Sequence, residues 1–215
     1  MSEKEIRLLE DLHWIGHDSF RLDKPIVIYI DPWKLPPDSP PADLVLVSHE
    51  HHDHCSPEDI ATIRKKDTIV VANPTAADKI DAPVTTLRAG ESLTVHDVLV
   101  EAVPAYNIDK HFHPKEAGHV GYVITIAGER LYFAGDTDNI PEMKQIDCDL
   151  ALLPVSGTYV MTAEEAAQAA AIINPKLAVP MHYGAGVVGT KMDAERFQEL
   201  CPVPVKIFEA IGPQE

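Results

Sequence analysis

Positive charge is scarce in this sequence. Among 215 residues there are 18 lysines and arginines against 34 aspartates and glutamates, which gives a net charge of −16 and a pI near 5.0. A groove that holds nucleic-acid phosphates needs a basic face. The charge balance therefore argues against a nucleic-acid partner, although it leaves open a nuclease with a local basic strip.

Cysteines are few, and long apolar runs are missing. Three cysteines are an odd number without paired spacing, which predicts a reduced, cytoplasmic setting and not a disulfide framework. No run approaches the ~18 apolar residues of a membrane helix, and Met1–Glu5 has no apolar signal-peptide core. We therefore expect a cytoplasmic protein that has no membrane partner.

The remaining composition is that of an ordinary globular protein. Hydrophobic residues make up 45% and charged residues 24% of the chain. A chain of this length buries a substantial core. We expect a single domain over residues 1–215, and the sequence leaves a homo-oligomer open.

Histidine and aspartate are concentrated at one place. Residues 49–54 have the pattern H-x-H-x-D-H, whose fixed members are His49, His51, Asp53 and His54. Imidazole and carboxylate are the ligands that divalent metals such as zinc prefer. Four such residues are too many for one tetrahedral ion that keeps an open position, so we predict two ions roughly 3.5–4 Å apart. Cys55 could be a further ligand or a redox group, but we interpret it as a small buried apolar residue.

The surroundings place this motif at the end of a strand. Residues 43–47 form an apolar run that predicts a buried strand. Residues 56–59 combine a serine cap, a proline and two acids, which predicts the start of a helix. Side chains alternate along a strand, so His49 and His51 can point the same way. The motif therefore occupies a strand-to-helix turn, where open α/β sheets place their sites.

Other runs predict the remaining elements. Residues 84–95 and 98–103 look like paired strands, and 205–208 like a final strand. Residues 57–66 predict a helix after the motif, and the Thr162–Glu165 capping box predicts another helix that ends near residue 174.

The histidine motif resembles that of the metallo-β-lactamase-fold hydrolases. Two further landmarks of that family follow in order: Gly135-Asp136-Thr137 after a strand, and His182 at the end of an apolar run. The resemblance extends at least from Trp14 to Tyr183. It implies an α/β (α+β) fold, a four-layer αββα sandwich of two mixed β-sheets flanked by helices. Compact members without extra domains, including ascorbate-6-phosphate lactonase-like proteins, are the most similar in character.

The resemblance also implies a set of metal ligands. One ion would be held by His49, His51 and His113, and the second by Asp53, His54 and His182, with Asp136 bridging both. The chain departs from the family at Asn107, near the place where the third histidine of the first ion usually lies. His111, His113 and His119 are the alternatives, and we select His113 because the following proline stiffens its loop.

Residues around these ligands suggest supporting roles. Asp31 ends a strand and is expected to accept hydrogen bonds from the metal loop. His17 lies in a stretch similar to the Gly-His-x-Ser/Cys-Phe segment of one branch of the family, and a structural turn is an equal alternative. Tyr106, Lys115 and Tyr183 could hold an anionic substrate group or a developing oxyanion, the alternative being ordinary packing.

These features predict a metal-dependent hydrolase that acts on a small molecule. A metal-bridging hydroxide would attack an ester, lactone, amide or phosphodiester, and Asp53 could also relay a proton. Zinc is the first choice for the two divalent ions, with manganese, iron and nickel open. The alternatives are a non-catalytic metal-binding protein, which Asn107 favours, and a di-iron redox protein, which usually requires more carboxylates and a flavin domain.

Overall fold

Two six-stranded β-sheets form the centre of the molecule. The computed structural model describes residues 6–214. The first sheet has the order β1 (Leu12–Gly16), β2 (Ser19–Leu22), β3 (Ile28–Ile30), β4 (Ala42–Val47), β5 (Arg64–Ala72) and β6 (Val84–Thr86). The second has the order β12 (Leu177–Met181), β11 (Leu150–Pro154), β10 (Glu129–Phe133), β9 (Val120–Ile126), β8 (Val98–Pro104) and β7 (Ser92–Val95).

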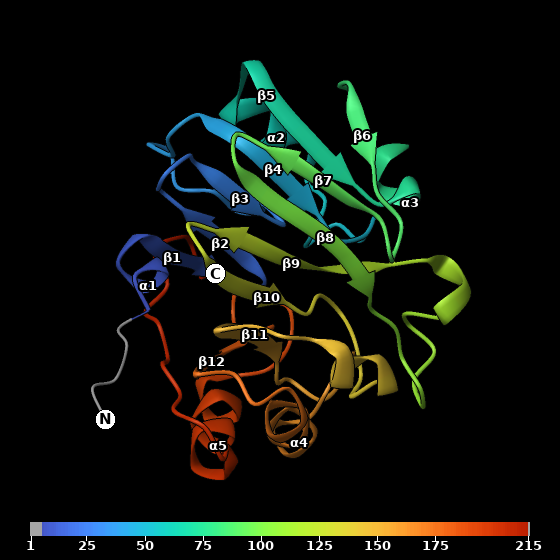
Figure 1. Cartoon of the computed structure of the whole chain (residues 1–215), viewed down its shortest axis with the longest axis vertical. Coiled ribbons are helices and arrows are strands. Elements are labelled where there is room, and N and C mark those ends of the chain that lie inside the picture. Colours follow the sequence, from blue (N-terminus) through green and yellow to red (C-terminus); the bar gives the residue numbers. More distant parts are fainter. Residues whose placement is uncertain (1–5, 215) are drawn as a thin grey trace.

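Helices cover the outer face of each sheet. Figure 1 shows α2 (Pro57–Ile63) and α3 (Pro74–Ala77) outside the first sheet, and α4 (Ala163–Ile173) and α5 (Lys191–Leu200) outside the second. Both sheets are mixed: β3 to β6 and β10 to β12 run parallel, and the other neighbours are antiparallel. The predicted αββα sandwich is therefore confirmed.

Both faces of strand β4 are apolar, because each face packs against a different hydrophobic core. Leu44 and Leu46 belong to the core between the two sheets. Val45 and Val47 point the other way, into a smaller core beneath α2 and α3. Successive side chains of a strand alternate between faces, and a parallel strand with a layer on each side must be apolar on both. This double burial fixes the position of the turn that follows β4.

The second sheet also contacts the end of β4. The hydroxyl of Tyr122 on β9 is buried and donates to the carbonyl of Val47 at 2.7 Å. The backbone N–H of Val120 donates to the carbonyl of Ser48 at 3.2 Å. Unpaired buried carbonyls are costly, so these bonds stabilise the point where the two sheets meet the histidine motif.

Three element predictions need correction. Residues 84–95 do not form one strand: β6 pairs with β5 in the first sheet, whereas β7 pairs with β8 in the second. The helix predicted over 57–66 ends at Ile63, because the chain enters β5 at the next residue. Residues 205–208 form no strand, and only Val205 makes an isolated bridge to β12. Prolines at 202 and 204 lack the N–H groups that a longer ladder would need.

Two other expectations can be compared with the structure. Helix α4 begins after Thr162 with the predicted capping box and ends at Ile173, and the capping residue Asn174 has a left-handed conformation. Within residues 6–214, no helix combines the length and the apolar character that crossing a membrane requires. The Met1–Glu5 segment, in which no signal-peptide core was expected, lies outside the described residues.

Candidate metal centre

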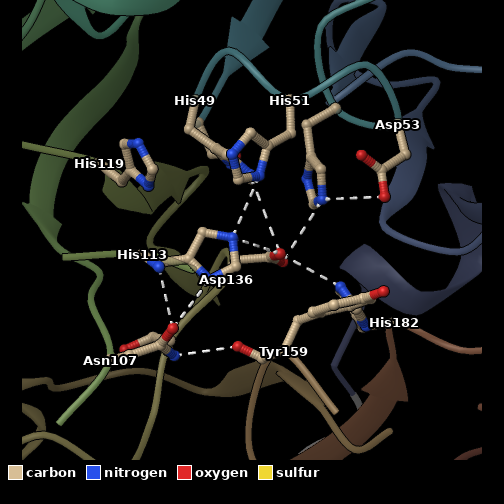
Figure 2. Close-up of polar contacts among 12 residues, drawn as sticks. His49, His51, Asp53, Asn107, His113, His119, Asp136, Tyr159 and His182 are labelled. Atoms are coloured by element: carbon tan, nitrogen blue, oxygen red, sulfur yellow. Dashed lines mark hydrogen bonds and ion pairs between the residues drawn. The ribbon is translucent and has the colours of Figure 1, made fainter. Parts of the chain in front are cut away.

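The histidine motif lies at one edge of the sandwich, as its sequence context predicts. It occupies the turn between β4 and α2, and the Ser56 hydroxyl caps the helix by accepting from the N–H of Asp59 at 3.2 Å. Loops that follow β8, β10 and β12 bring His113, Asp136 and His182 to the same edge. Residues distant in sequence thus converge on one cluster, which Figure 2 shows.

A first group of donor atoms consists of His49, His51, His113 and Asp136. The Nδ1 atom of His51 lies 3.1 Å from Nε2 of His49 and 3.2 Å from Nε2 of His113. The same His113 nitrogen lies 3.1 Å from Oδ2 of Asp136. Donors about 2.1 Å from one tetrahedral ion would be about 3.4 Å apart. Both the chemistry and the spacing of this group suit a divalent metal.

Asn107 orients His113 and does not replace it. The Asn107 Oδ1 atom accepts from the backbone N–H of His113 at 2.9 Å and lies 3.2 Å from its Nδ1 atom. The Asn107 amide in turn donates to Oδ1 of Asp138 at 3.2 Å and to the carbonyl of Tyr159 at 3.0 Å. An Nδ1–H held by a carbonyl oxygen leaves Nε2 free to bind a metal.

Substitution of Asn107 tests this role. Asn107→Ala should weaken metal binding at the first group about 10- to 100-fold, which is the usual cost of losing the partner that orients a ligating histidine. Metal content after dialysis against a weak chelator measures the effect. Retention equal to that of the wild type would contradict it.

His119 and His111, the two alternatives to His113, lie outside the first group of donors. The ring of His119 stacks on that of His49 with centroids 4.8 Å apart, and its Nε2 atom faces Glu50 at 3.2 Å. His111 is exposed to solvent. Of the three candidates, the structure brings only His113 into the donor group.

A second group of donors lies on the other side of Asp136. Oδ1 of Asp136 is 3.4 Å from Nε2 of His54, and its Oδ2 is 3.2 Å from Nε2 of His182. Oδ2 of Asp53 lies 3.9 Å from the same His54 nitrogen. Asp136 therefore faces both groups of imidazoles, as a bridging carboxylate must.

Hydrogen bonds orient the histidines of this second group. Nδ1 of His54 lies 2.8 Å from Oδ2 of Asp31, which also accepts the Ser48 hydroxyl. Oδ1 of Asp31 accepts the Ser48 backbone N–H at 2.7 Å. Nδ1 of His182 lies 2.8 Å from the Ser156 hydroxyl. The expected contact between Asp31 and the metal loop is thus present, and both Nε2 atoms face the centre of the cluster.

His17 and Asp18 complete this side of the cluster. Both are buried in the turn between β1 and β2. Nε2 of His17 lies 3.3 Å from Oδ2 of Asp53 and 3.4 Å from Oδ2 of Asp18. These contacts favour the interpretation of His17 as part of the site over that of a structural turn residue. Sequence reasoning missed Asp18, although a carboxylate directly after a candidate site histidine was a visible signal.

The ionisable groups strongly perturb one another. Burial lowers the pKa of His49 well below its usual range. Burial also disfavours the charged form of His182, yet the neighbouring Asp136 and Asp18 carboxylates raise its pKa to about 9. The pKa of Asp136 lies well below its usual range, because His182 and His54 outweigh the effect of its burial. Carboxylates and imidazoles thus interact strongly at the place where a cation would bind.

A pocket of about 400 Å³ opens onto these donors. Side chains of both groups form part of its lining, among them His51, Asp53, His113, Asp136 and His182. The rest of the lining is contributed by Glu50, His52, Lys79, Phe112, Tyr159 and Val187. This volume lies in the range of small-molecule sites. The donors are therefore buried but reachable from one side.

The three residues expected to contact a substrate do not line this pocket. The Tyr106 hydroxyl donates to Glu142 at 2.9 Å, and the Lys115 ammonium donates to the same carboxylate at 2.9 Å. Tyr183 packs on Trp14 with ring centroids 4.7 Å apart. Phe112 and Tyr159, which sequence reasoning did not select, stand at the pocket instead.

Cys55 is a buried apolar residue, as interpreted from the sequence. It belongs to the small core beneath α2, and burial raises the pKa of its thiol to about 11. It lies outside all the donor groups found among residues 6–214. Neither a ligand role nor a redox role is supported by this environment.

Comparisons with known proteins agree with this geometry. The family model described as the beta-lactamase superfamily domain matches residues 11–182. Two similar proteins bear the name metal-dependent hydrolase. One, from Caldivirga maquilingensis, is 31% identical over 207 residues and 88% of each chain. The other, from Methanoculleus marisnigri, is 38% identical over 183 residues and 80% of each chain.

Solved structures share the fold. A crystal structure from Parabacteroides distasonis has 36% identity and a TM-score of 0.84, and the match covers 93% of this chain and 92% of that one. The metallo hydrolase Igni18 from Ignicoccus hospitalis has 23% identity and a TM-score of 0.75 over 94% and 95% of the two chains. At that identity, the second likeness concerns the fold alone.

Proposed function

This chain belongs to the beta-lactamase superfamily and is a metal-dependent hydrolase, and we propose that it cleaves small-molecule esters, lactones, amides or phosphodiesters with two divalent ions. His49, His51 and His113 hold the first ion in this proposal. Asp53, His54 and His182 would hold the second, and Asp136 would serve both. We further propose that residues 1–215 act as one domain.

The position of Asp136 is the observation that carries the proposal. Its carboxylate is buried, and its two oxygens lie 3.1–3.4 Å from imidazole nitrogens of both donor groups. Its Oδ1 atom has no hydrogen-bond partner among the described residues. A buried carboxylate flanked by two sets of Nε2 atoms fits a pair of cations better than a purely structural network.

The side chains around the ions have separate tasks. When bound, the ions would lower the pKa of water toward neutrality and polarise the bond to be cleaved. Asp53 borders the pocket, and it can accept a proton from the attacking water and pass it to the leaving group. Burial alone would raise the pKa of Asp53, but His17 and His54 hold it below its usual range, so this carboxylate is ionised, as a metal ligand must be.

The pocket walls suggest how a substrate is oriented. Phe112 and Tyr159 meet edge to face with ring centroids 4.6 Å apart, and Val187 lies in the same lining. Lys79 is the lysine of this lining, and it also donates to the carbonyl of Glu50 at 2.8 Å. A small molecule that presents an apolar or aromatic part to the two rings fits this surface.

Asn107 no longer favours the alternative of a non-catalytic metal-binding protein. Asn107 raised doubt about the first ion because it stood near the place of a histidine. Since Asn107 instead hydrogen-bonds His113, the chain keeps three imidazoles and a carboxylate for that ion. Zinc is the proposed metal for this nitrogen-rich group, and manganese, iron and nickel remain to be compared with it.

Metal content and turnover test the proposal together. The protein is purified without chelator, its metal is counted per chain, and it is assayed with panels of esters, lactones, amides and phosphodiesters. We expect two ions per chain, and hydrolysis in at least one panel that a chelator abolishes and added metal restores. His113→Ala should lower the content toward one ion, whereas His111→Ala, an exposed control in the same loop, should not.

Two results would contradict the proposal. Two bound ions without turnover in any panel would indicate a metal-binding protein that is not a hydrolase of these substrates. One ion per chain, unchanged by His113→Ala, would reject the two-ion centre and the role of His113.

A further inference from the structure

The Asp18 carboxylate is buried without the partners that such a group needs. It is fully buried, and neither oxygen has a hydrogen-bond partner among the described residues. Within residues 6–214, the ion-pair neighbours of its Oδ2 atom are histidines: His17 at 3.4 Å, and His54 and His182 at 3.8 Å. A buried ion costs several kcal/mol when it is not paired and hydrogen-bonded. The chain by itself thus leaves this carboxylate unsatisfied.

The spacing around Asp18 matches that of a shared ion. Its Oδ2 atom lies 3.8 Å from Nε2 of His54 and from Nε2 of His182, the two nitrogens that face Asp136 at 3.4 and 3.2 Å. Donors bound about 2.1 Å from one ion lie at most about 4.2 Å apart. All these separations fall within that limit, and the two 3.8 Å distances from Asp18 are longer than direct hydrogen bonds.

We propose that Asp18 is a direct ligand of the ion at the second donor group. That ion would then be bound by three carboxylates and two imidazoles: Asp18, Asp53, His54, Asp136 and His182. The inference rests on the proposed two-ion centre, and it adds a ligand that lies outside the H-x-H-x-D-H pattern.

The additional carboxylate would make the two ends of the centre chemically different. The first group offers three imidazoles and one carboxylate, whereas the second is rich in oxygen. Oxygen ligands suit manganese and similar hard ions, and imidazole suits zinc. We therefore expect the preference for zinc over manganese to be smaller at the second group than at the first.

His17 explains how two carboxylates can lie so close together. Its Nε2 atom lies between Asp18 and Asp53, at 3.4 and 3.3 Å. A neutral imidazole there can donate to one carboxylate while both bind the same cation. In the competing account, Asp18 is a protonated structural acid that contacts no metal.

Asp18→Asn separates these accounts, because it keeps the size of the side chain and removes its charge. Metal-free wild type and variant are titrated with zinc, manganese and cobalt against a competing chelator. If Asp18 is a ligand, the second ion binds at least about 100-fold more weakly in the variant, a loss greater than that for an orienting partner, while the first changes little. Asp43→Asn, which removes a carboxylate paired with Lys65, is the control and should change neither.

Thermal unfolding supplies a second measurement, because Asp18→Asn should affect the metal-free and the metal-bound protein in opposite directions. Without metal, the variant should melt at the same temperature as the wild type or higher, because it lacks a buried, unsatisfied carboxylate. With saturating metal, its gain in melting temperature should be smaller than that of the wild type. A structural acid would give equal gains in both proteins.

Cobalt bound to the wild type extends the test to a protein with no substitution. The visible spectrum that appears when the second equivalent of cobalt binds should indicate five or more ligands around that ion. A four-coordinate spectrum, or an unchanged second affinity in Asp18→Asn, would overturn the role of Asp18 and leave the two-ion hydrolase standing. If the wild type binds no second ion, the two-ion centre itself fails, and the role of Asp18 fails with it.

Discussion

Asp136→Asn should leave less than one tightly bound ion per chain and lower turnover by about 10³-fold or more. Asp136 faces both donor groups, so its loss weakens both ions at once, whereas any other ligand serves one. Removal of a single group that stabilises developing charge already costs 10²–10³ in rate. Metal analysis after gel filtration and initial rates on the best substrate of the panel measure the two effects.

A matched control distinguishes the loss of the bridging carboxylate from a general disturbance of the fold. Asp147→Asn changes an aspartate whose side chain is 94% exposed, so it should keep both the ions and the rate. Circular dichroism of Asp136→Asn checks that the sandwich still forms. Two retained ions per chain in a folded Asp136→Asn protein would refute the bridging role.

Removal of the ions should lower the melting temperature by more than about 10 °C. Buried atoms of His17, Asp18, His54 and Asp136 lack hydrogen-bond partners among the described residues, so the folded chain without metal retains unsatisfied polar groups. An ion present at 1,000 times its dissociation constant adds about 4.1 kcal/mol. For a chain of 150–250 residues, each kcal/mol corresponds to about 2–4 °C.

Calorimetry of the chelated and reconstituted protein checks this expectation. After the chelator is removed by dialysis, added zinc should restore the higher melting temperature. Asp136→Asn serves as the internal comparison, because a protein that has already lost its ions should respond little to chelator. Equal melting temperatures with and without metal would mean that the donor cluster is satisfied without a cation.

The part of the centre that depends on local sequence could be predicted. His49, His51, Asp53 and His54 follow a strand that is apolar on both faces and precede a capped helix, so neighbours in the chain determine both their chemistry and their position. Asp136 follows β10 by three residues, and His182 stands directly after β12. Periodicity and turn signals are local, so they predicted individual strands and helices, whereas the layers of the sandwich were implied by the resemblance to the family.

The predictions that failed concerned side-chain direction and sheet membership. Tyr106 and Lys115 were selected for their chemistry, but both turn toward Glu142. Residues 84–95 look like one strand, yet they supply β6 to one sheet and β7 to the other. Residue type cannot reveal either outcome, because both depend on which distant strand or carboxylate lies nearest in space.

The sequence by itself determined the family and the core of the histidine motif, because the motifs that carry the resemblance depend on the order and spacing of residues. The αββα architecture was implied by that resemblance. Only the tertiary structure decided the roles suggested for Asn107 and Asp18. Asn107 meets Asp138 and Tyr159 from other loops, and Asp18 meets His54 and His182 across the junction of the two sheets. Hydrogen bonds and metal coordination act over a few ångströms, so these roles arise only once the two sheets have packed together.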